Sequence, residues 1–233
     1  MPTRDQIHET LIELFDAERA VRELHDDLAE LPPDELLDVL AEALPGAIAE
    51  TDEDEASLQL VRIAALLAEI EGPRAVDGLI DVLTSELPEP RRAAGEHLEE
   101  IAFERFKEVA QGIERALKRL PVGSPALPEL PYVIAEVPEP GVSRLLGKFL
   151  SHADPDAVAA AIESLVELGD PGTVRLLTPL LSDKRTVELA DEIGDATSEV
   201  TIGELALEAV SLLESMSGDE EGDEQAGDGG AKS

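Results

Sequence analysis

A repeated unit of about 31–34 residues constrains the fold of this chain more than any other feature. A pattern of Pro followed by spaced Leu and Val begins at Pro140 and recurs 31 residues later at Pro171, and it also occurs 98 residues before Pro171, at Pro73. A second pattern, Pro followed by paired Ala and then Leu, recurs after 67 residues, from Pro88 to Pro155. These offsets are close to multiples of the length of two helices joined by a turn. Because neither helix buries its apolar face alone, the repeat predicts units that stack into one continuous core.

Apolar residues recur at helical spacing in most of the chain, whereas strand signals such as alternation with a period of two and clusters of β-branched residues are scarce. A capping box from Thr3 to Gln6 predicts the start of a long first helix. Its apolar residues are three, four or seven apart: Ile7, Leu11, Leu14, Val21, Leu24, Leu28 and Leu31. A second helix is predicted from Asp34, and a third from the acidic residues 52–55 to Ile70.

Two segments depart from the regular pattern. Residues 121–140 contain six prolines, so at most a short helix such as 129–136 fits there, and a break or irregular turn in the stack is expected. Residues 182–200 form an insertion before the final helix, which we predict at 201–216. The insertion is predicted to be a surface loop between two helices of one repeat, and a partner-binding loop is the alternative.

The composition changes at Ser217. From there to the end, the chain contains Gly and acidic residues but no aliphatic side chain larger than Ala, and it carries 6 acids and 1 Lys. Such a segment buries too little apolar surface to offset its ordering entropy. We therefore predict a helical repeat domain at 1–216 and a disordered acidic tail at 217–233. Most of the net charge of -35 belongs to the domain.

Two stretches carry a family resemblance. The sequences PEPRRAAGEHLEEIA at 88–102 and DPDAVAAAIESLVELGDPGTVRLLTPLL at 154–181 resemble HEAT repeats, whose second helices start with Asp-Pro or Glu-Pro and continue through paired Ala. The resemblance is clear over residues 72–102 and 138–216, and looser over 34–72 and 103–137. It implies an all-α fold, an α-α superhelix of about five to six helix pairs. It implies almost nothing about activity, because this fold hosts unrelated functions.

Composition excludes several classes of protein. The chain has no cysteine, which removes disulfides, thiolate metal sites and thiol nucleophiles. Its 53 acidic residues against 18 basic ones, and its 2% of aromatic residues, argue against direct nucleic-acid binding, which needs cations and stacking platforms. Residues 1–19 are charged every few positions and no run of about 18 apolar residues occurs, so we expect a soluble cytoplasmic protein without membrane contact.

Catalytic motifs such as GxSxG, a P-loop or His-Glu-x-x-His do not occur in the sequence. Among HEAT-type enzymes, deoxyhypusine hydroxylase holds two irons with several His-Glu pairs, and here only His8 is followed by Glu. The ring-poor composition offers little to the tetrapyrrole of a phycobilin lyase, and the charge has the wrong sign for a HEAT-like DNA glycosylase. His25, His97 and His152 complete the histidines, and we predict no catalytic, cofactor-binding or metal-binding residue.

Cations are concentrated between residues 91 and 119. This weak candidate site for a partner comprises Arg91, Arg92, Arg105, Lys107, Arg115, Lys118 and Arg119. One interpretation is a helix pair with solvated pairs of opposite charge, each worth a few tenths of a kcal/mol. The other is a neutral-to-basic patch for an acidic partner or for self-association.

The acidity of the domain has three explanations: solubility in a salty cytoplasm, recognition of a basic partner by an acidic concave surface, and mimicry of a nucleic acid. The sequence favours a non-enzymatic protein–protein interaction scaffold that binds a basic or mixed-charge protein. An accessory enzyme of the HEAT-like lyase type and a repeat protein whose charge serves solubility alone are the alternatives.

Overall fold

The computed structural model describes residues 2–190 and 197–224, and in them the protein is an all-α protein with one small hairpin, as the sequence predicts for the fold class. The helices are α1 (Arg4–Ala29), α2 (Pro33–Ile48), α3 (Glu53–Ala68), α4 (Pro73–Val82), α5 (Pro88–Arg119), α6 (Ala126–Ala135), α7 (Val142–Phe149), α8 (Pro155–Glu167), α9 (Val174–Leu177) and α10 (Ile202–Glu224). The antiparallel strands are β1 (Thr186–Ala190) and β2 (Thr197–Thr201).

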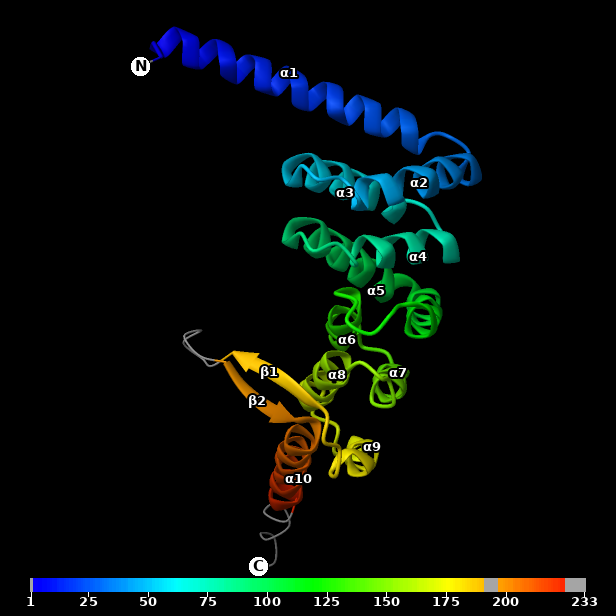
Figure 1. Ribbon diagram of the computed structural model, residues 1–233, viewed down its shortest axis with the longest axis vertical. Helices are drawn as coiled ribbons and strands as arrows, with labels where there is room; N and C mark the ends of the chain where they lie inside the picture. The colour runs from blue at the N-terminus through cyan, green and yellow to red at the C-terminus, as the bar shows by residue number, and fades with distance from the viewer. Residues whose placement is uncertain (1, 191–196, 225–233) are drawn as a thin grey trace, which may run out of the picture.

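The helices from α2 onward stack along the long axis in two layers (Figure 1). The inner layer contains α3, the first part of α5, α6, α8 and α10, and the outer layer contains α2, α4, the second part of α5, α7 and α9. The long helix α5 crosses between the layers because its backbone is non-helical at Arg105 (φ -135°, ψ 48°). Each inner helix is therefore paired with the outer helix that precedes it.

Glycine allows close approach of helices in the core. A Cβ atom at Gly112 of α5 would overlap the side chain of Val76 in α4. A Cβ atom at Gly78 would lie 2.9 Å from Cδ1 of Leu67 in α3. Helix α4 thus packs tightly against a neighbour on each side, and its residues Val76 and Leu79 are almost completely buried.

Helix starts follow local rules that the sequence displays. Pro occupies the first turn of α2, α4, α5 and α8, where its missing N–H costs no hydrogen bond. Asp154 caps α8: its Oδ1 accepts a hydrogen bond from the backbone N–H of Ala157 at 3.1 Å. Its Oδ2 accepts another from the N–H of Gly123 at 2.6 Å, and Asp154 is only 1% exposed. One buried carboxylate therefore joins the start of α8 to the turn before α6.

The structure differs from the sequence prediction in two segments. Within 121–140 the helix begins at Ala126 and contains Pro131, so it is longer than the expected 129–136. Where a surface loop is predicted at 182–200, the ends of the segment form β1 and β2, and Val187 of β1 is buried beside α8. Helix α10 is described to Glu224, and residues 225–233 of the predicted tail lie outside the described part.

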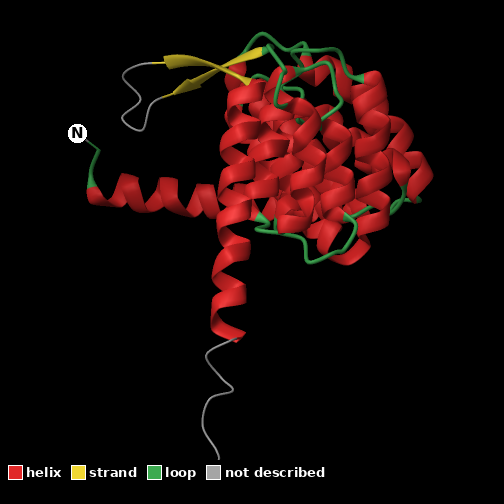
Figure 2. Cartoon of the chain, turned by 90° about the horizontal axis from the view of Figure 1, so that it is seen from below, coloured by secondary structure: helices red, strands yellow, loops and turns green. Residues whose placement is uncertain are grey.

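Helix α1 and the β1–β2 hairpin project from the same side of the helix stack (Figure 2). None of the 26 residues of α1, all of them described, is buried. In the described part of the chain, no helix combines the length and the apolar character needed to cross a bilayer.

Candidate functional site

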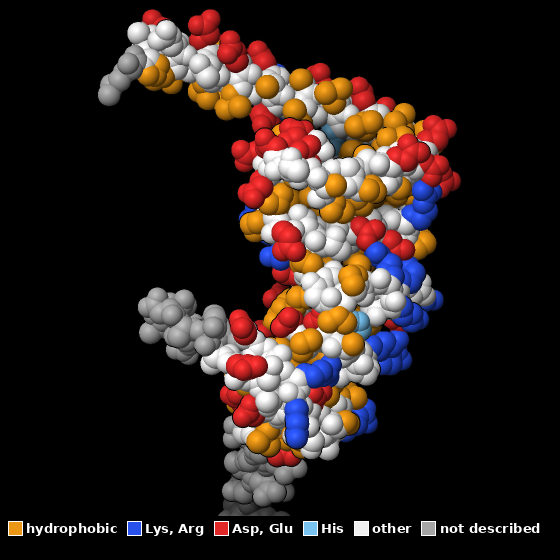
Figure 3. All heavy atoms as spheres, in the orientation of Figure 1, with side chains coloured by type: hydrophobic (Ala, Val, Ile, Leu, Met, Phe, Trp, Pro, Cys, Tyr) orange, Lys and Arg blue, Asp and Glu red, His pale blue; other side chains and the backbone are white. Residues whose placement is uncertain are grey.

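The inner layer faces the hollow side of the molecule, between α1 and the hairpin (Figure 3). Acidic side chains lie along this side, whereas most of the visible Lys and Arg side chains lie on the opposite, outer side. A concave surface lined by one sign of charge focuses its potential and concentrates ligands of the opposite charge. The inner layer is therefore the first place to look for a binding site.

A hollow of about 460 Å³ opens between α3 and the start of α5. Its acidic lining comes from Glu53 and Asp54 at the start of α3 and from Glu89 at the start of α5. The hydroxyl of Ser57 donates a hydrogen bond of 2.8 Å to Glu89. Leu58 adds an apolar surface to the hollow and is 60% exposed. Arg62 also lines the hollow, which therefore combines three carboxylates and one cation with exposed hydrocarbon.

A second acidic feature lies where α6 packs against α8, and we name it the Tyr132 cluster: Tyr132, Glu129, Glu163 and Glu167. The phenolic O–H of Tyr132 donates a hydrogen bond of 2.6 Å to Glu163. Burial, and then the neighbouring carboxylates, raise the pKa of Tyr132 above its usual range. The phenol therefore stays protonated and neutral, and the charges of Glu163, Glu167 and Glu129 all act on it.

The hairpin extends the acidic surface toward the start of α8. Burial, followed by the charges of Asp154 and Glu188, raises the pKa of Asp156. Glu188 of β1 lies directly opposite Glu199 of β2 in the register of the hairpin, and both are exposed. Like charges at opposed positions are unfavourable in a sheet, so this pair adds negative potential without stabilising the hairpin.

This arrangement suits recognition of cations better than catalysis. Glu129 already lies 3.9 Å from Arg91, so an Arg or Lys side chain placed on the face of Tyr132 would gain a cation–π interaction together with a salt bridge to Glu163. The surface is open, so a bound segment would remain partly in contact with water. The hollow at α3 lies on the same layer, which allows one extended segment to reach both features.

The structure separates the seven cations of the predicted partner site. Arg91 lies 3.9 Å from Glu129 on the inner layer, and Arg92 lies 3.9 Å from Glu96 on the same helix. Arg105 pairs with Glu108 at the kink, where Lys107 borders a shallow hollow.

The other three predicted cations are on the outer part of α5, where Arg115 and Arg119 bind Asp77 and Asp81 of α4 and Lys118 lies near Glu114. The seven residues form no continuous band because α5 changes layer at Arg105. The kink was not visible in the sequence.

Sequence reasoning missed a ladder of ion pairs that joins successive outer helices. Its members are Arg74 with Asp38, Arg115 with Asp77, Arg119 with Asp81, and Lys148 with Glu114. The partners are 34 to 38 residues apart, close to the repeat length, and this spacing is the signal that could have revealed them. Each pair is partly exposed and worth at most about 1 kcal/mol. Four of the cations on the outer side thus have a structural role.

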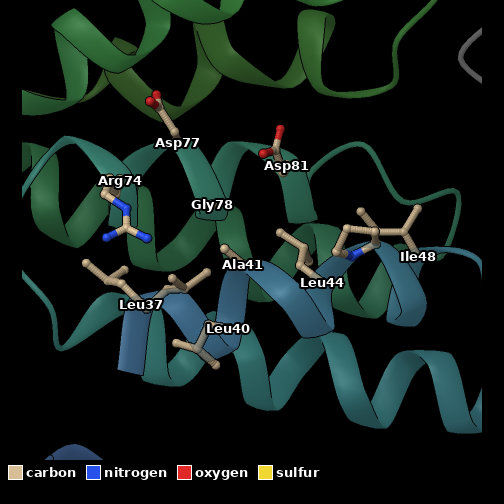
Figure 4. A pocket seen from close by; sticks show the side chains of 11 residues that line it. Leu37, Leu40, Ala41, Leu44, Ile48, Arg74, Asp77, Gly78 and Asp81 are labelled. Carbon is tan, nitrogen blue, oxygen red and sulfur yellow. The ribbon is translucent and has the colours of Figure 1, made fainter. Parts of the chain in front are cut away.

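The outer layer also contains a cavity of about 480 Å³ between α2 and α4 (Figure 4). Leu37, Leu40, Leu44 and Ile48 of α2 supply most of its apolar lining. Asp77 and Asp81 point away from it toward α5, where they meet the arginines of the ladder. The cavity therefore offers hydrocarbon but no set of converging polar groups.

The histidines lie apart from one another and from the Tyr132 cluster. His25 lies 2.8 Å from Glu69, His97 3.6 Å from Glu100, and His152 3.1 Å from the carbonyl oxygen of Leu117. Among the residues described, no three His, Asp or Glu side chains are arranged so that they could hold a metal ion.

Comparison with known proteins adds little. The sequence matches no protein-family model and no curated protein. The comparison with solved structures finds a crystal structure of an engineered protein from the Northeast Structural Genomics Consortium, with 20% identity, coverage of 83% of this chain and 90% of that chain, and a TM-score of 0.32. A likeness at that score does not define a shared fold, so the function has to be argued from the site.

Proposed function

We propose that this protein is a non-enzymatic HEAT-like scaffold whose acidic inner layer binds a basic segment of another protein in the cytoplasm. The observation that carries the proposal is the Tyr132 cluster: Tyr132 is 42% exposed, its hydroxyl donates a hydrogen bond to Glu163, and the charges of Glu163, Glu167 and Glu129 contribute to the raised pKa of its phenol. The acidic hollow between α3 and α5 supports it, because both features lie on the same layer. The stacked helix pairs and the repeat in the sequence support the assignment to HEAT-like proteins.

The geometry favours an extended segment that crosses the inner helices. Packed helices lie about 8–10 Å apart, and an extended chain advances about 3.3–3.6 Å per residue. Three steps between the four inner helices from α3 to α8 cover about 24–30 Å, so a segment of about 7–9 residues would reach from α3 to α8. Its Arg or Lys side chains would recur about every third residue, once for each helix crossed.

An Arg-Gly-Ser peptide of about that length is a suitable probe, with fluorescence anisotropy as the measurement. We expect the triple variant Glu129→Gln, Glu163→Gln, Glu167→Gln to bind it at least about tenfold more weakly than the unmodified protein. A control triple removes the same charge from exposed acids away from α6 and α8: Glu35→Gln, Glu42→Gln, Glu71→Gln. The control is expected to change the affinity less than about twofold.

The same experiment separates recognition from solubility. If both triples weaken binding equally, the net charge alone attracts the peptide and the proposal is wrong. Raising the salt from about 0.1 M to about 1 M shortens the Debye length from about 10 Å to about 3 Å. Under the proposal the advantage of the unmodified protein over the first triple shrinks with salt, and Tyr132→Leu weakens binding at both concentrations.

A further inference from the structure

Helix α1 has an apolar face that the rest of the chain leaves uncovered over the N-terminal part of the helix, residues 4–20. Its large apolar side chains include Ile7, Leu14 and Leu24, which are 56%, 54% and 63% exposed. Contact with the stack is limited to its C-terminal part, where Val21 and His25 are half-buried and His25 lies beside Glu69 of α3. The N-terminal part extends beyond α2 and α3 (Figures 1 and 2), and hydrophobic side chains lie along the side of α1 that faces the rest of the chain (Figure 3).

This face has the spacing of a coiled-coil seam. We name as the α1 seam the residues at the first and fourth positions of its heptads: Ile7, Thr10, Leu14, Ala17, Val21, Leu24 and Leu28. A seven-residue spacing of this kind keeps one stripe of a helix against a partner helix over its whole length. A stripe that served only to cover α2 and α3 would not need to continue to Ile7, far beyond them. The α1 seam therefore indicates a helical partner.

The charges beside the α1 seam argue against a second copy of the same helix. Glu13 and Asp27 flank the seam on one side, and Glu18 flanks it on the other. In a parallel pair, Glu13 would face Glu18 of the other copy, and in an antiparallel pair it would face Asp27. The cations Arg19 and Arg22 are at neither flank, so they cannot relieve this repulsion.

We infer that α1 binds a basic amphipathic helix of a partner protein, with apolar residues at heptad spacing and Lys or Arg beside them. The partner's apolar stripe would pack on the α1 seam, and its cations would meet Glu13, Glu18 and Asp27. This inference rests on the proposed function for the basic character of the partner. It adds a second contact, because α1 lies above the same hollow side that the acidic inner layer faces.

The test uses three synthetic peptides of about 28 residues, which is four heptads, and the full-length protein. The first has Leu at the seam positions and Lys at the flanks, the second has Glu at the flanks, and the third is a scrambled version of the first with its leucines distributed all round the helix. We expect the first peptide to bind at least about tenfold more tightly than either of the others, measured by fluorescence anisotropy.

Two variants of α1 provide a matched comparison. Leu14→Ser, on the α1 seam, is expected to weaken binding of the first peptide at least about tenfold. Ile12→Ser removes a side chain of similar exposure, 48%, from the opposite face and is expected to leave binding unchanged. Neither position is buried, so both variants should keep the circular dichroism spectrum of the unmodified protein.

Three results would overturn the inference: equal binding of the scrambled peptide, equal effects of the two variants, or a dimer in sedimentation that Leu14→Ser converts to a monomer. The last would show that a second copy covers the seam. Failure of the proposed function looks different, because the Arg-Gly-Ser peptide would then be insensitive to the Glu129, Glu163, Glu167 triple whatever happens at α1.

Discussion

Helices α1 and α3 have similar apolar spacing and opposite environments. Helix α3 has 16 residues, of which six are buried, whereas α1 has 26 residues and buries none. Both begin with a side-chain cap, from Asp52 and Thr3 respectively, so local signals do not separate them. The difference is the number of neighbours: α3 has helices on three sides, and α1 touches the stack only near its C-terminal end. An amphipathic pattern therefore predicts a helix but not what covers it.

The largest expected difference in stability between the helix stack and α1 comes from truncating one Leu in each. Leu98, in the inner part of α5, is fully buried, so Leu98→Ala should lower the free energy of unfolding by about 2–5 kcal/mol. Leu14→Ala in α1 should change it by less than about 0.5 kcal/mol, because the side chain is already exposed. Urea denaturation followed by circular dichroism measures both. Similar losses would mean that α1 is covered in solution.

Removing a helix cap should also lower the free energy of unfolding more in the stack than in α1, but the difference should be smaller than for the Leu variants. Asp154→Ala takes away the cap of α8 and leaves the N–H of Gly123 without its acceptor, which should cost about 2–3 kcal/mol. Thr3→Ala removes the cap of α1, a helix outside the cooperative core. It should lower the helical signal slightly and leave the denaturation midpoint in place. A shift of that midpoint would show that α1 unfolds together with the stack.

The smallest expected difference in stability between the stack and α1 comes from removing one ion pair in each region, and it depends on pH. Hydrogen bonds from Arg185 lower the pKa of Asp183, and Arg185 also donates to the carbonyl oxygen of His152, which joins the base of the hairpin to the turn after α7. Because the folded-state pKa is lowered, the pair stabilises the fold above the unfolded pKa of about 3.9 and loses this effect as the pH falls through the folded-state value.

We expect Asp183→Asn to cost about 1 kcal/mol at pH 7 and nothing at about pH 2. The matched change in α1 is Asp16→Asn, which breaks the exposed pair with Arg19 and should have no measurable effect at either pH. Denaturation midpoints of both variants across this pH range provide the measurement. A cost for Asp183→Asn that persists at pH 2 would indicate a steric rather than an electrostatic role.

The sequence predicted the helices more accurately than it predicted the surfaces. The helix expected from Asp34 is α2, which starts one residue earlier, and the capping box from Thr3 to Gln6 is present with both of its hydrogen bonds. The hairpin was missed because its strands have only five residues each, and six residues separate them in the sequence instead of the two of a tight hairpin turn. Burial of Val187 against α8, rather than local preference, positions β1.

The candidate sites, like the fold, depend in part on contacts that the sequence alone does not reveal. A cluster of cations in the sequence suggested one patch, but the kink at Arg105 places Arg91 and Arg115 in different layers. The Tyr132 cluster was not predicted, because Tyr132 and Glu163 are 31 residues apart and meet only when α6 packs on α8. That separation equals one repeat offset, so a search for polar residues one repeat apart could have found the pair.

By itself the sequence determined that this chain is α-helical, where most of its helices begin, that its Pro, Ala and Leu patterns recur, and that the protein is strongly acidic. These properties depend on residues a few positions apart, or on composition, and each is set by the chain locally. Only the tertiary structure decided which apolar face is covered, which carboxylates gather around Tyr132, and which cations join successive repeats. Those outcomes depend on contacts between residues 30 or more positions apart, and these contacts form only when the helices stack.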